Sequence, residues 1–353
     1  MWLQADKEHM RPTIICVTPI KNEAWILRRF LRCASLFADH IVVADQQSAD
    51  DSRSIAQQFS KVHLIDNPGA AYHEGDRQKL LIDAARKLPP IAGNSGRLIL
   101  ALDADEMLSS NFTTSPEWQT VLAAPAGAII TANWANLAPD FRSAWLSTSF
   151  DQVIGYMDDG RPHDGKALHN FRLPAPPDSP RLALNDIRLL HYQYTDWQRM
   201  KSKHRWYQCF EIIKSPDKSA VDIFRQYHHM YAIDEKTRCP IDPAWFKAYV
   251  DMGIDMTSTI KHAWYYWDEQ VAEWLVTHGT QKFAKLDIWA SEGHPDWAEI
   301  YRRIHDGKQP PRDISDPRTE DERTTLRWLR STQATATDPA VRAREAELRK
   351  AGW

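Results

Sequence analysis

The chain has 353 residues, of which 43% are hydrophobic and 26% are charged, and its formal net charge at pH 7 is −3. This length exceeds a typical single domain of roughly 100–200 residues, and the composition is that of a globular protein rather than a disordered one. With 44 basic and 47 acidic side chains, no global field draws the chain to nucleic acid or to an anionic membrane. The composition therefore excludes a general nucleic-acid-binding protein, and any basic site must be local.

The four cysteines show neither paired spacing nor a zinc-binding pattern, and they are Cys16, Cys33, Cys209 and Cys239. This usage fits a reducing compartment. The N-terminal segment lacks the basic-then-apolar order of a signal peptide, and no apolar run approaches the roughly 20 residues of a membrane span. We therefore expect a soluble, cytoplasmic protein without a transmembrane segment, for which peripheral membrane contact stays open.

Short apolar runs alternate with helical patterns through the first 132 residues, which predicts a parallel sheet wrapped by helices. The expected strands are 13–17, 41–44, 62–65, 98–102 and 128–132, with a further strand at 187–192. We expect Asn22 to cap a helix after the first strand. A second helix is expected over 74–88, where Pro89 and Pro90 would end it.

The pattern changes beyond Trp134. Residues 134–180 are rich in turn residues, as is typical of long functional loops. The sequence Thr195-Asp196-Trp197-Gln198 has the form of a capping box at the start of a helix. An aromatic-rich helical region follows at about 242–279, with Gly279 as its C-terminal cap. A last charged helix is expected after Asp338, and its few apolar positions predict a loosely held tail.

Acidic residues follow the ends of three predicted strands. Asp103 and Asp105 end the fourth strand, Asp45 ends the second, and Glu23 follows the first. Ligands of open α/β sheets bind at the carboxyl ends of the strands. Two carboxylates there suit Mg²⁺ or Mn²⁺, which take their remaining ligands from substrate phosphates and water. A capping or turn role is the alternative for each residue taken singly.

Three segments together resemble the inverting family 2 glycosyltransferases, which have the nucleotide-sugar-binding GT-A fold. They are Thr18-Pro19-Ile20-Lys21-Asn22-Glu23, the D-x-x-S-x-D-x-S/T turn at 45–52, and the metal motif Asp103-Ala104-Asp105-Glu106. The resemblance covers roughly residues 12–132. It implies a GT-A type, Rossmann-like mixed sheet flanked by helices, and the helical patterns add an aromatic-rich helical module after it. We therefore expect a nucleotide-sugar-binding and catalytic domain over 1–235, a helical module over 236–305 and a charged helical tail over 306–353.

The resemblance also implies an activity, that of a hexosyltransferase-type enzyme. Such an enzyme moves a sugar from a nucleotide-diphosphate sugar, with a UDP-sugar as the expected donor, to a saccharide, lipid-linked or other hydroxyl acceptor with inversion. Mn²⁺ or Mg²⁺ is the implied cofactor. The residues that the resemblance assigns to the nucleotide-sugar are Pro19, Glu23, Asp45, Arg77 and Asp103, with Asp105 and Asp103 as metal ligands.

Two further residues are candidates for contacts with the metal or the diphosphate. His191, at the end of a predicted strand, looks similar to a further metal or diphosphate ligand of the family, and a structural role is the alternative. Lys203 lies in a segment from Arg199 to Arg205 that carries four fixed positive charges. Such a segment can help to neutralise a diphosphate, and a solvated basic face is the alternative.

The general base stays open, because the Glu-Asp pair and the tryptophan motif of the family are missing. Inversion requires a carboxylate near the acceptor hydroxyl. The loop carboxylates Asp158 and Asp159 are the first candidates and Asp186 is the next, although Asp-Asp-Gly is also an ordinary turn sequence. Two other functions remain: a nucleotidyltransferase, which would usually carry a Gly-rich phosphate loop after the first strand, and a catalytically inactive nucleotide-binding or scaffold protein on the same fold.

Overall fold

The computed structural model describes residues 11–68, 73–147, 152–163, 165, 171–262, 264–289 and 295–353. The chain divides into two units: unit 1 is Met1–Thr195 with Cys239–Ile260, and unit 2 is Asp196–Arg238 with Lys261–Trp353. This division differs from the expected three parts. Segment 239–260 belongs to unit 1 because Trp245, Tyr249, Ile254 and Met256 are buried in its core, and the segment 306–353 belongs to unit 2.

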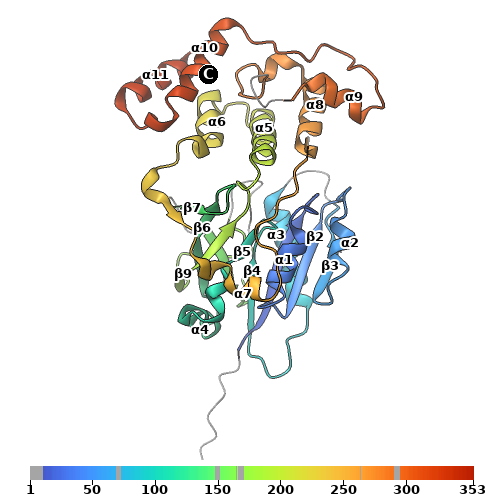
Figure 1. The fold of residues 1–353 in the computed structure, drawn as a ribbon, viewed down its shortest axis with the longest axis vertical. Coiled ribbons are helices and arrows are strands. Elements are labelled where there is room, and N and C mark those ends of the chain that lie inside the picture. The colour runs from blue at the N-terminus through green and yellow to red at the C-terminus, as the bar shows by residue number, and fades with distance from the viewer. Residues whose placement is uncertain are drawn as a thin grey trace, which may run out of the picture. The chain divides into compact units, whose positions relative to one another are not determined.

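Unit 1 is built on a mixed sheet, which confirms the expected α/β class (Figure 1). The strands of the described part are β1 (Thr13–Ile20), β2 (His40–Asp45), β3 (Val62–Asp66), β4 (Arg97–Ala101), β5 (Glu106–Leu108), β6 (Ile129–Leu137), β7 (Ser143–Leu146), β8 (Gln152–Met157), β9 (Arg181–His191) and β10 (Arg238–Pro240). Their order is β10-β7-β6-β8-β4-β1-β2-β3, and β9 pairs with both β6 and β5. Strands β1 to β4 are parallel, whereas β8 is antiparallel to both β4 and β6.

Helices cover both faces of the parallel strands. Helix α1 (Leu27–Ala34) packs on one set of alternating strand residues and α3 (Glu74–Lys87) packs on the other set, as the two-residue period of a strand requires. Helix α3 ends before Pro89 as predicted. Asn22 does not cap α1, because Ile26 occupies the N-cap and Asn22 lies in a turn with φ of 55°. The shorter helices of unit 1 are α2 (Ser52–Ala56), α4 (Pro116–Leu122), α7 (Lys247–Asp251) and the 3₁₀ helices η1 (Ser110–Thr113) and η4 (Pro243–Trp245).

The described part of unit 2 is mainly helical. Its helices are α5 (Trp197–Lys214), α6 (Ala220–Tyr227), α8 (Tyr266–His278), α9 (Trp297–Ile304), α10 (Glu320–Ser331), α11 (Pro339–Lys350) and the 3₁₀ helices η2 (His229–Tyr231), η3 (Glu235–Thr237), η5 (Thr280–Phe283) and η6 (Gln333–Thr335). The expected helix over 242–279 is wrong in its middle, since α7 ends at Asp251 and α8 begins at Tyr266. The Gly279 cap is confirmed, with φ of 80°.

Asp196, rather than the Thr195 of the expected capping box, caps α5. Its side chain accepts hydrogen bonds from the backbone N–H groups of Gln198 and Arg199. The Thr195 hydroxyl donates instead to the carbonyl oxygen of Tyr192. The helix begins where the sequence predicted, but its cap lies one residue later.

The C-terminal helix α11 is held firmly, so the prediction of a loose tail is wrong. It starts after Asp338 as expected. Its buried residues are Glu345 and Leu348, and Leu348 packs with Leu329 of α10 and Phe224 of α6. The buried Glu345 accepts a hydrogen bond of 2.7 Å from Nε of Arg225. Arg349 also pairs with Asp222 of α6 at 2.7 Å. One buried leucine and these ion pairs therefore hold this charged helix.

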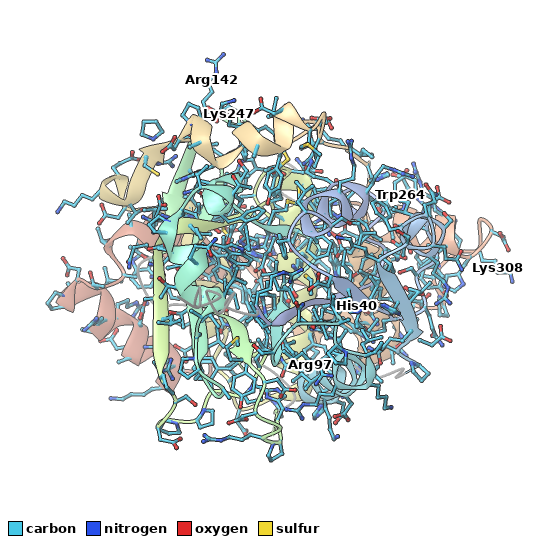
Figure 2. All side chains as sticks on the ribbon, turned by 90° about the horizontal axis from the view of Figure 1, so that it is seen from below. His40, Arg97, Arg142, Lys247, Trp264 and Lys308 are labelled. Carbon is cyan, nitrogen blue, oxygen red and sulfur yellow. The ribbon has the colours of Figure 1, made fainter. Side chains whose placement is uncertain are left out.

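Charged side chains occupy the periphery of unit 1. Figure 2 shows Arg142 and Lys247 projecting outward, and Lys247 pairs with Asp251 at 2.7 Å on the surface of α7. Within the described ranges, no helix combines the length and the apolar composition that crossing a membrane requires.

The packing of α11 can be tested with Leu348→Ala. The substitution should lower the free energy of unfolding by about 2–3 kcal/mol, because it removes buried apolar surface and leaves a cavity. Arg344→Ala in the same helix is the control, since its side chain is 58% exposed and surface changes typically cost less than about 0.5 kcal/mol. Urea denaturation of the full chain measures both values. Equal stability of the two variants would mean that α11 is loosely held.

Candidate functional site

The loop after β1 and the loop after β2 are tied together at the carboxyl edge of the sheet. Three backbone N–H groups of the first loop donate to side chains of the second: Asn22 to Ser48 Oγ (2.9 Å), Glu23 to Ser52 Oγ (2.8 Å) and Ala24 to Asp50 Oδ2 (3.0 Å). In return, Asn22 Oδ1 accepts from the N–H of Ala49 at 2.7 Å. The serines and the second aspartate of the D-x-x-S-x-D-x-S turn therefore fix the backbone around Glu23.

The first aspartate of that turn, Asp45, is buried at the end of β2. Its Oδ1 accepts from the N–H of Ser48 at 3.1 Å and its Oδ2 pairs with Nη1 of Arg53 at 2.8 Å. Asp45 lies in register with Ile20, next to Pro19, at the edge of the neighbouring strand β1. Both oxygens of Asp45 have protein partners, so a nucleoside contact would share them. Glu23 Oε2 accepts from Nε1 of Trp25 at 2.6 Å.

The Asp-Ala-Asp-Glu segment follows β4 and turns sharply. The N–H of Asp103 donates to Glu106 Oε2 at 3.0 Å, and the N–H of Glu106 donates to the carbonyl of Asp103 at 2.9 Å. The side chain of Asp103 is 41% exposed, whereas Asp105 and Glu106 are buried. The carbonyl of Asp105 accepts from the N–H of Tyr192 at 2.8 Å, so the segment is also fixed to the end of β9.

Arg172 bridges two carboxylates of this segment. Its Nη2 lies 2.9 Å from both Asp103 Oδ2 and Glu106 Oε1, and its Nη1 donates to Glu106 Oε2. Burial alone would lower the pKa of the guanidinium, but the charges of Asp103 and Glu106 raise that pKa above its usual value. Arg172 therefore stays cationic and neutralises part of the acidic edge.

His191 lies beside this cluster, at the end of β9. It is in register with Glu106 of β5 and Asn136 of β6. Its Nδ1 lies 2.8 Å from Asn136 Oδ1, and its ring stacks on Trp134 with centroids 4.9 Å apart. Since an amide oxygen only accepts, Nδ1 carries the proton and the lone pair of the neutral ring is on Nε2. Trp134 also donates to Glu106 Oε1 at 2.7 Å.

The structure brings together Pro19, Glu23, Asp45, Asp103, Asp105 and His191 at the carboxyl edge of one sheet. Arg77 joins them, because it lies in the first turn of α3, which connects the carboxyl end of β3 to the start of β4. Lys203 belongs to α5 of unit 2, where its Nζ lies 5.9 Å from the ring centroid of Trp267.

The basic segment of α5 is an interior feature rather than a solvated face. Arg205 is 4% exposed and pairs with Asp268, itself 2% exposed, at 2.7 Å. Arg199 is buried with its guanidinium 4.8 Å from the ring of Trp267. Two of the four positive charges, those of Arg199 and Arg205, are thus buried against partners inside unit 2. The alternative of a fully solvated basic face is wrong for these two residues.

The candidate bases Asp158 and Asp159 lie at the opposite edge of the sheet. Because β8 is antiparallel to β4, its last residue Met157 pairs with Leu98 at the start of β4. The length of β4, at about 3.3 Å per residue, separates them from Asp103. Asp158 pairs with Arg86 at 2.7 Å, and Asp159 accepts from the hydroxyl of Tyr156. Their placement removes the reason for choosing them as bases.

Asp186 is exposed and lies well before the end of β9. It sits where the register between β6 and β9 shifts. Its N–H donates to Glu117 Oε2 of α4 at 3.0 Å, and its carbonyl accepts from Asn111 at 3.1 Å. The structure therefore does not bring Asp186 together with Asp103 and Asp105.

The side chains at the carboxyl edge carry atoms of the types that bind divalent ions. Asp103 and Asp105 supply hard oxygens, and the tautomer of His191 directs a lone pair onto Nε2. Over the described ranges, no three His, Cys, Asp or Glu side chains are grouped as a preformed metal site. Any ion at this edge would therefore need further ligands from phosphates and water. The ligand roles of Asp103, Asp105 and His191 stay predictions.

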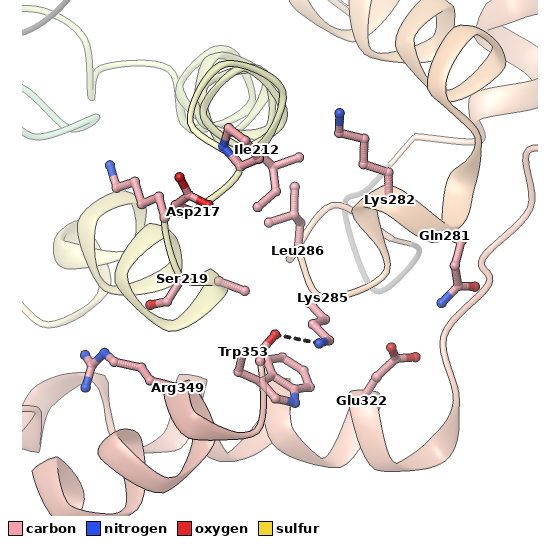
Figure 3. A pocket seen from close by; sticks show the side chains of 14 residues that line it. Ile212, Asp217, Ser219, Gln281, Lys282, Lys285, Leu286, Glu322, Arg349 and Trp353 are labelled. Carbon is pink, nitrogen blue, oxygen red and sulfur yellow. Dashed lines mark hydrogen bonds between the residues drawn. The ribbon is translucent and has the colours of Figure 1, made fainter.

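Two hollows among the described residues are lined by residues other than those of this sheet edge. Figure 3 shows a cavity of about 470 Å³ in unit 2, between the ends of α5 and α11. Its lining mixes Lys282, Lys285, Glu322 and Trp353, and Nζ of Lys285 donates to the carbonyl of Gly352 at 2.6 Å. None of the predicted site residues lines this cavity or the shallow hollow beside α4.

Sequence reasoning missed three residues of the edge: Glu106, Arg172 and Trp134. Glu106 was part of the quoted motif, and its position directly after the second aspartate was a usable signal. Arg172 and Trp134 lie in the turn-rich region 134–180, where no periodic pattern indicated which side chains return to the sheet.

The tie between the two loops can be tested with Ser52→Ala. Removing the acceptor of the Glu23 N–H should cost about 1–2 kcal/mol locally. The Glu23 amide should then exchange with deuterated water roughly 5–30 times faster. Ser54→Ala is the matched control, because its hydroxyl is exposed and donates only to the carbonyl of Asp51. Equal exchange in both variants would contradict the tie.

The buried ion pair of α5 predicts a strong effect of Arg205→Gln. Leaving Asp268 charged and unpaired inside unit 2 should lower the free energy of unfolding by about 3 kcal/mol or more. Lys201→Gln, at a partly exposed position of the same helix, should cost less than about 1 kcal/mol. Similar denaturation midpoints for the two variants would restore the solvated-face interpretation.

Comparisons with known proteins give weak matches. No protein-family model matches the sequence, and no curated protein is significantly similar to it. Glucosyl-3-phosphoglycerate synthase from Mycobacterium tuberculosis, in complex with phosphoglyceric acid, is 17% identical over 35% of this chain and 44% of its own, with a TM-score of 0.25. The chain thus spans less than half of that protein.

Two other solved structures are similar at the same level. 4-Diphosphocytidyl-2C-methyl-D-erythritol synthase is 14% identical over 44% of this chain and 72% of its own, with a TM-score of 0.26. HddC from Yersinia pseudotuberculosis is 10% identical over 51% of this chain and 93% of its own, with a TM-score of 0.30. Similarity this low carries no conclusion about activity, and the mixed α/β fold rests on the strand pairing described above.

Proposed function

We propose that the chain transfers a sugar from a nucleotide-diphosphate sugar, with a UDP-sugar as donor, to an acceptor hydroxyl. One observation carries the proposal. Asp103 and Asp105 follow β4 at the same sheet edge as Glu23 and Asp45, so four acidic residues meet at the position where open α/β sheets bind ligands.

The donor half of the site is assigned to the residues of this edge. Pro19 and Glu23 are proposed to border the nucleoside, and Asp45 holds the loop that positions them. Arg77, in the first turn of α3, adds positive charge to the N-terminal end of the helix dipole, which favours a phosphate. Asp105, Asp103 and His191 are proposed to hold Mn²⁺ or Mg²⁺, which when bound would neutralise the departing diphosphate without a proton transfer.

For the transfer step we propose inversion. The acceptor hydroxyl attacks the anomeric carbon from the side opposite the diphosphate, the glycosidic bond to the diphosphate breaks, and the hydroxyl proton passes to a base on the acceptor side. Asp158, Asp159 and Asp186 lie elsewhere in the fold, so the proposal gives them no part in this step.

The loop after β1 favours sugar transfer over nucleotidyl transfer. A Gly-rich loop of a nucleotidyltransferase offers backbone N–H groups to phosphates. Here the N–H groups of Asn22, Glu23 and Ala24 already donate to side chains of the neighbouring loop. The loop is therefore built to support the edge rather than to cradle phosphate.

UDP release from UDP-sugars in the presence of Mn²⁺ tests the proposal. Asp105→Asn should lower the rate at least about 100-fold, as expected for loss of a group that stabilises leaving-group charge. Asp140→Asn is the matched control, because Asp140 is exposed and its carboxylate accepts from the N–H of Arg142. Pyrophosphate release instead of UDP would indicate a nucleotidyltransferase, and nucleotide binding without turnover would indicate an inactive protein.

A further inference from the structure

The two carboxylates that Arg172 bridges have different surroundings. Glu106 has no exposed side-chain surface, and its oxygens also accept from Nε1 of Trp134 at 2.7 Å and from the N–H of Asp103 at 3.0 Å. The side chain of Asp103 is 41% exposed. In the described part of the chain, Arg172 is the hydrogen-bonding partner of the Asp103 carboxylate.

This difference decides which contact can be exchanged. Leaving the charge of Glu106 buried without a cation would be strongly unfavourable, so the contact between Arg172 and Glu106 is permanent. The contact with Asp103 is partly exposed on the side of the aspartate, where water screens it, so it is the easier of the two contacts to replace. Arg172 is thus held by the carboxylate of Glu106 and makes a weaker, exchangeable contact with the carboxylate of Asp103.

We infer that Arg172 competes with a divalent cation for Asp103 and thereby sets the metal affinity of the edge. This inference rests on the proposed function, in which Asp103 and Asp105 hold the ion. A cation bound to Asp103 would lie close to the guanidinium, and like charges at such separations repel. Binding of the ion is therefore opposed by the contact of Arg172 with Asp103 Oδ2, while Arg172 stays on Glu106.

The competition predicts opposite effects for two related variants. In Glu106→Gln the shape and one of the two acceptor oxygens remain, while the amide NH2 replaces the other. The charge of Arg172 is then left to the aspartates of the segment, so Mn²⁺ should bind more weakly than in the natural chain. In the double variant Glu106→Gln/Arg172→Gln the competitor is gone and the buried charge of Glu106 is removed with it, while Asp105 keeps its charge and gains the ion as its cation. Mn²⁺ should then bind at least about tenfold more tightly than in Glu106→Gln, which corresponds to about 1.4 kcal/mol.

A third variant makes a smaller change, so that the inference can be tested even if the double variant does not fold. Arg172→Lys keeps a cation for Glu106 but lacks the fork that reaches both carboxylates at once. It should bind Mn²⁺ about threefold more tightly than the natural chain. Arg142→Gln, a change at an exposed arginine that has no part in the proposed site, is the matched control and should not alter binding.

Mn²⁺ binding is measured on the full chain without nucleotide, from the electron paramagnetic resonance signal of the free ion. Asp105→Asn in each background identifies the binding that depends on the edge.

Asp105-dependent binding that follows the predicted order supports the inference, as does binding that appears only in the double variant. Asp105-dependent binding that is unchanged across the Arg172 variants overturns the inference and leaves the proposed function intact. Absence of Asp105-dependent binding in every variant overturns the inference and the metal role together, and UDP release then decides separately whether sugar transfer stands.

Discussion

The buried charge of Glu106 is the constraint on which the acidic edge depends. A carboxylate without exposed surface must be paired and hydrogen-bonded, and here Arg172, Trp134 and the N–H of Asp103 meet that demand together. These three groups come from the loop before β9, from β6 and from the turn after β4. One buried charge thus joins three segments far apart in the sequence and fixes the turn that presents Asp103 and Asp105.

The acidic motifs of the first half have two roles. Some of their side chains hold the backbone of the sheet edge, and others are exposed to solvent there. Ser48, Asp50 and Ser52 are occupied with the backbone of the neighbouring loop, and Asp45 is occupied with Ser48 and Arg53. Asp103, by contrast, is partly exposed. A sequence motif that looks like a set of ligand contacts is here in large part the framework that keeps the sheet edge in shape.

The sequence predicted the parallel strands well because each was an apolar run followed by a polar residue at its carboxyl end. It did not predict β8, because residues 134–180 were expected to form turn-rich loops, so the antiparallel direction of this strand was missed with it. That missing information placed Asp158 and Asp159 at the wrong edge. The return of Arg172 to the sheet was equally hidden, since a turn-rich segment has no period from which burial could be inferred. Neither interpretation of the basic segment, a diphosphate contact or a solvated face, predicted that Arg199 packs against Trp267 and that Arg205 pairs with Asp268 inside unit 2.

The arrangement of hydrogen-bond donors has a consequence for any diphosphate at this edge. Many nucleotide sites meet phosphate charge with backbone N–H groups of a glycine-rich loop. In this chain the corresponding N–H groups after β1 are engaged by the loop after β2, and the carboxylates after β4 add negative charge. Phosphate charge would then have to be balanced by mobile or side-chain cations. In the inference above, a divalent ion and the guanidinium of Arg172, which contacts Oδ2 of Asp103, compete for this carboxylate. The framework that stabilises the edge therefore makes the choice between these two cations the determining step in assembling the proposed site.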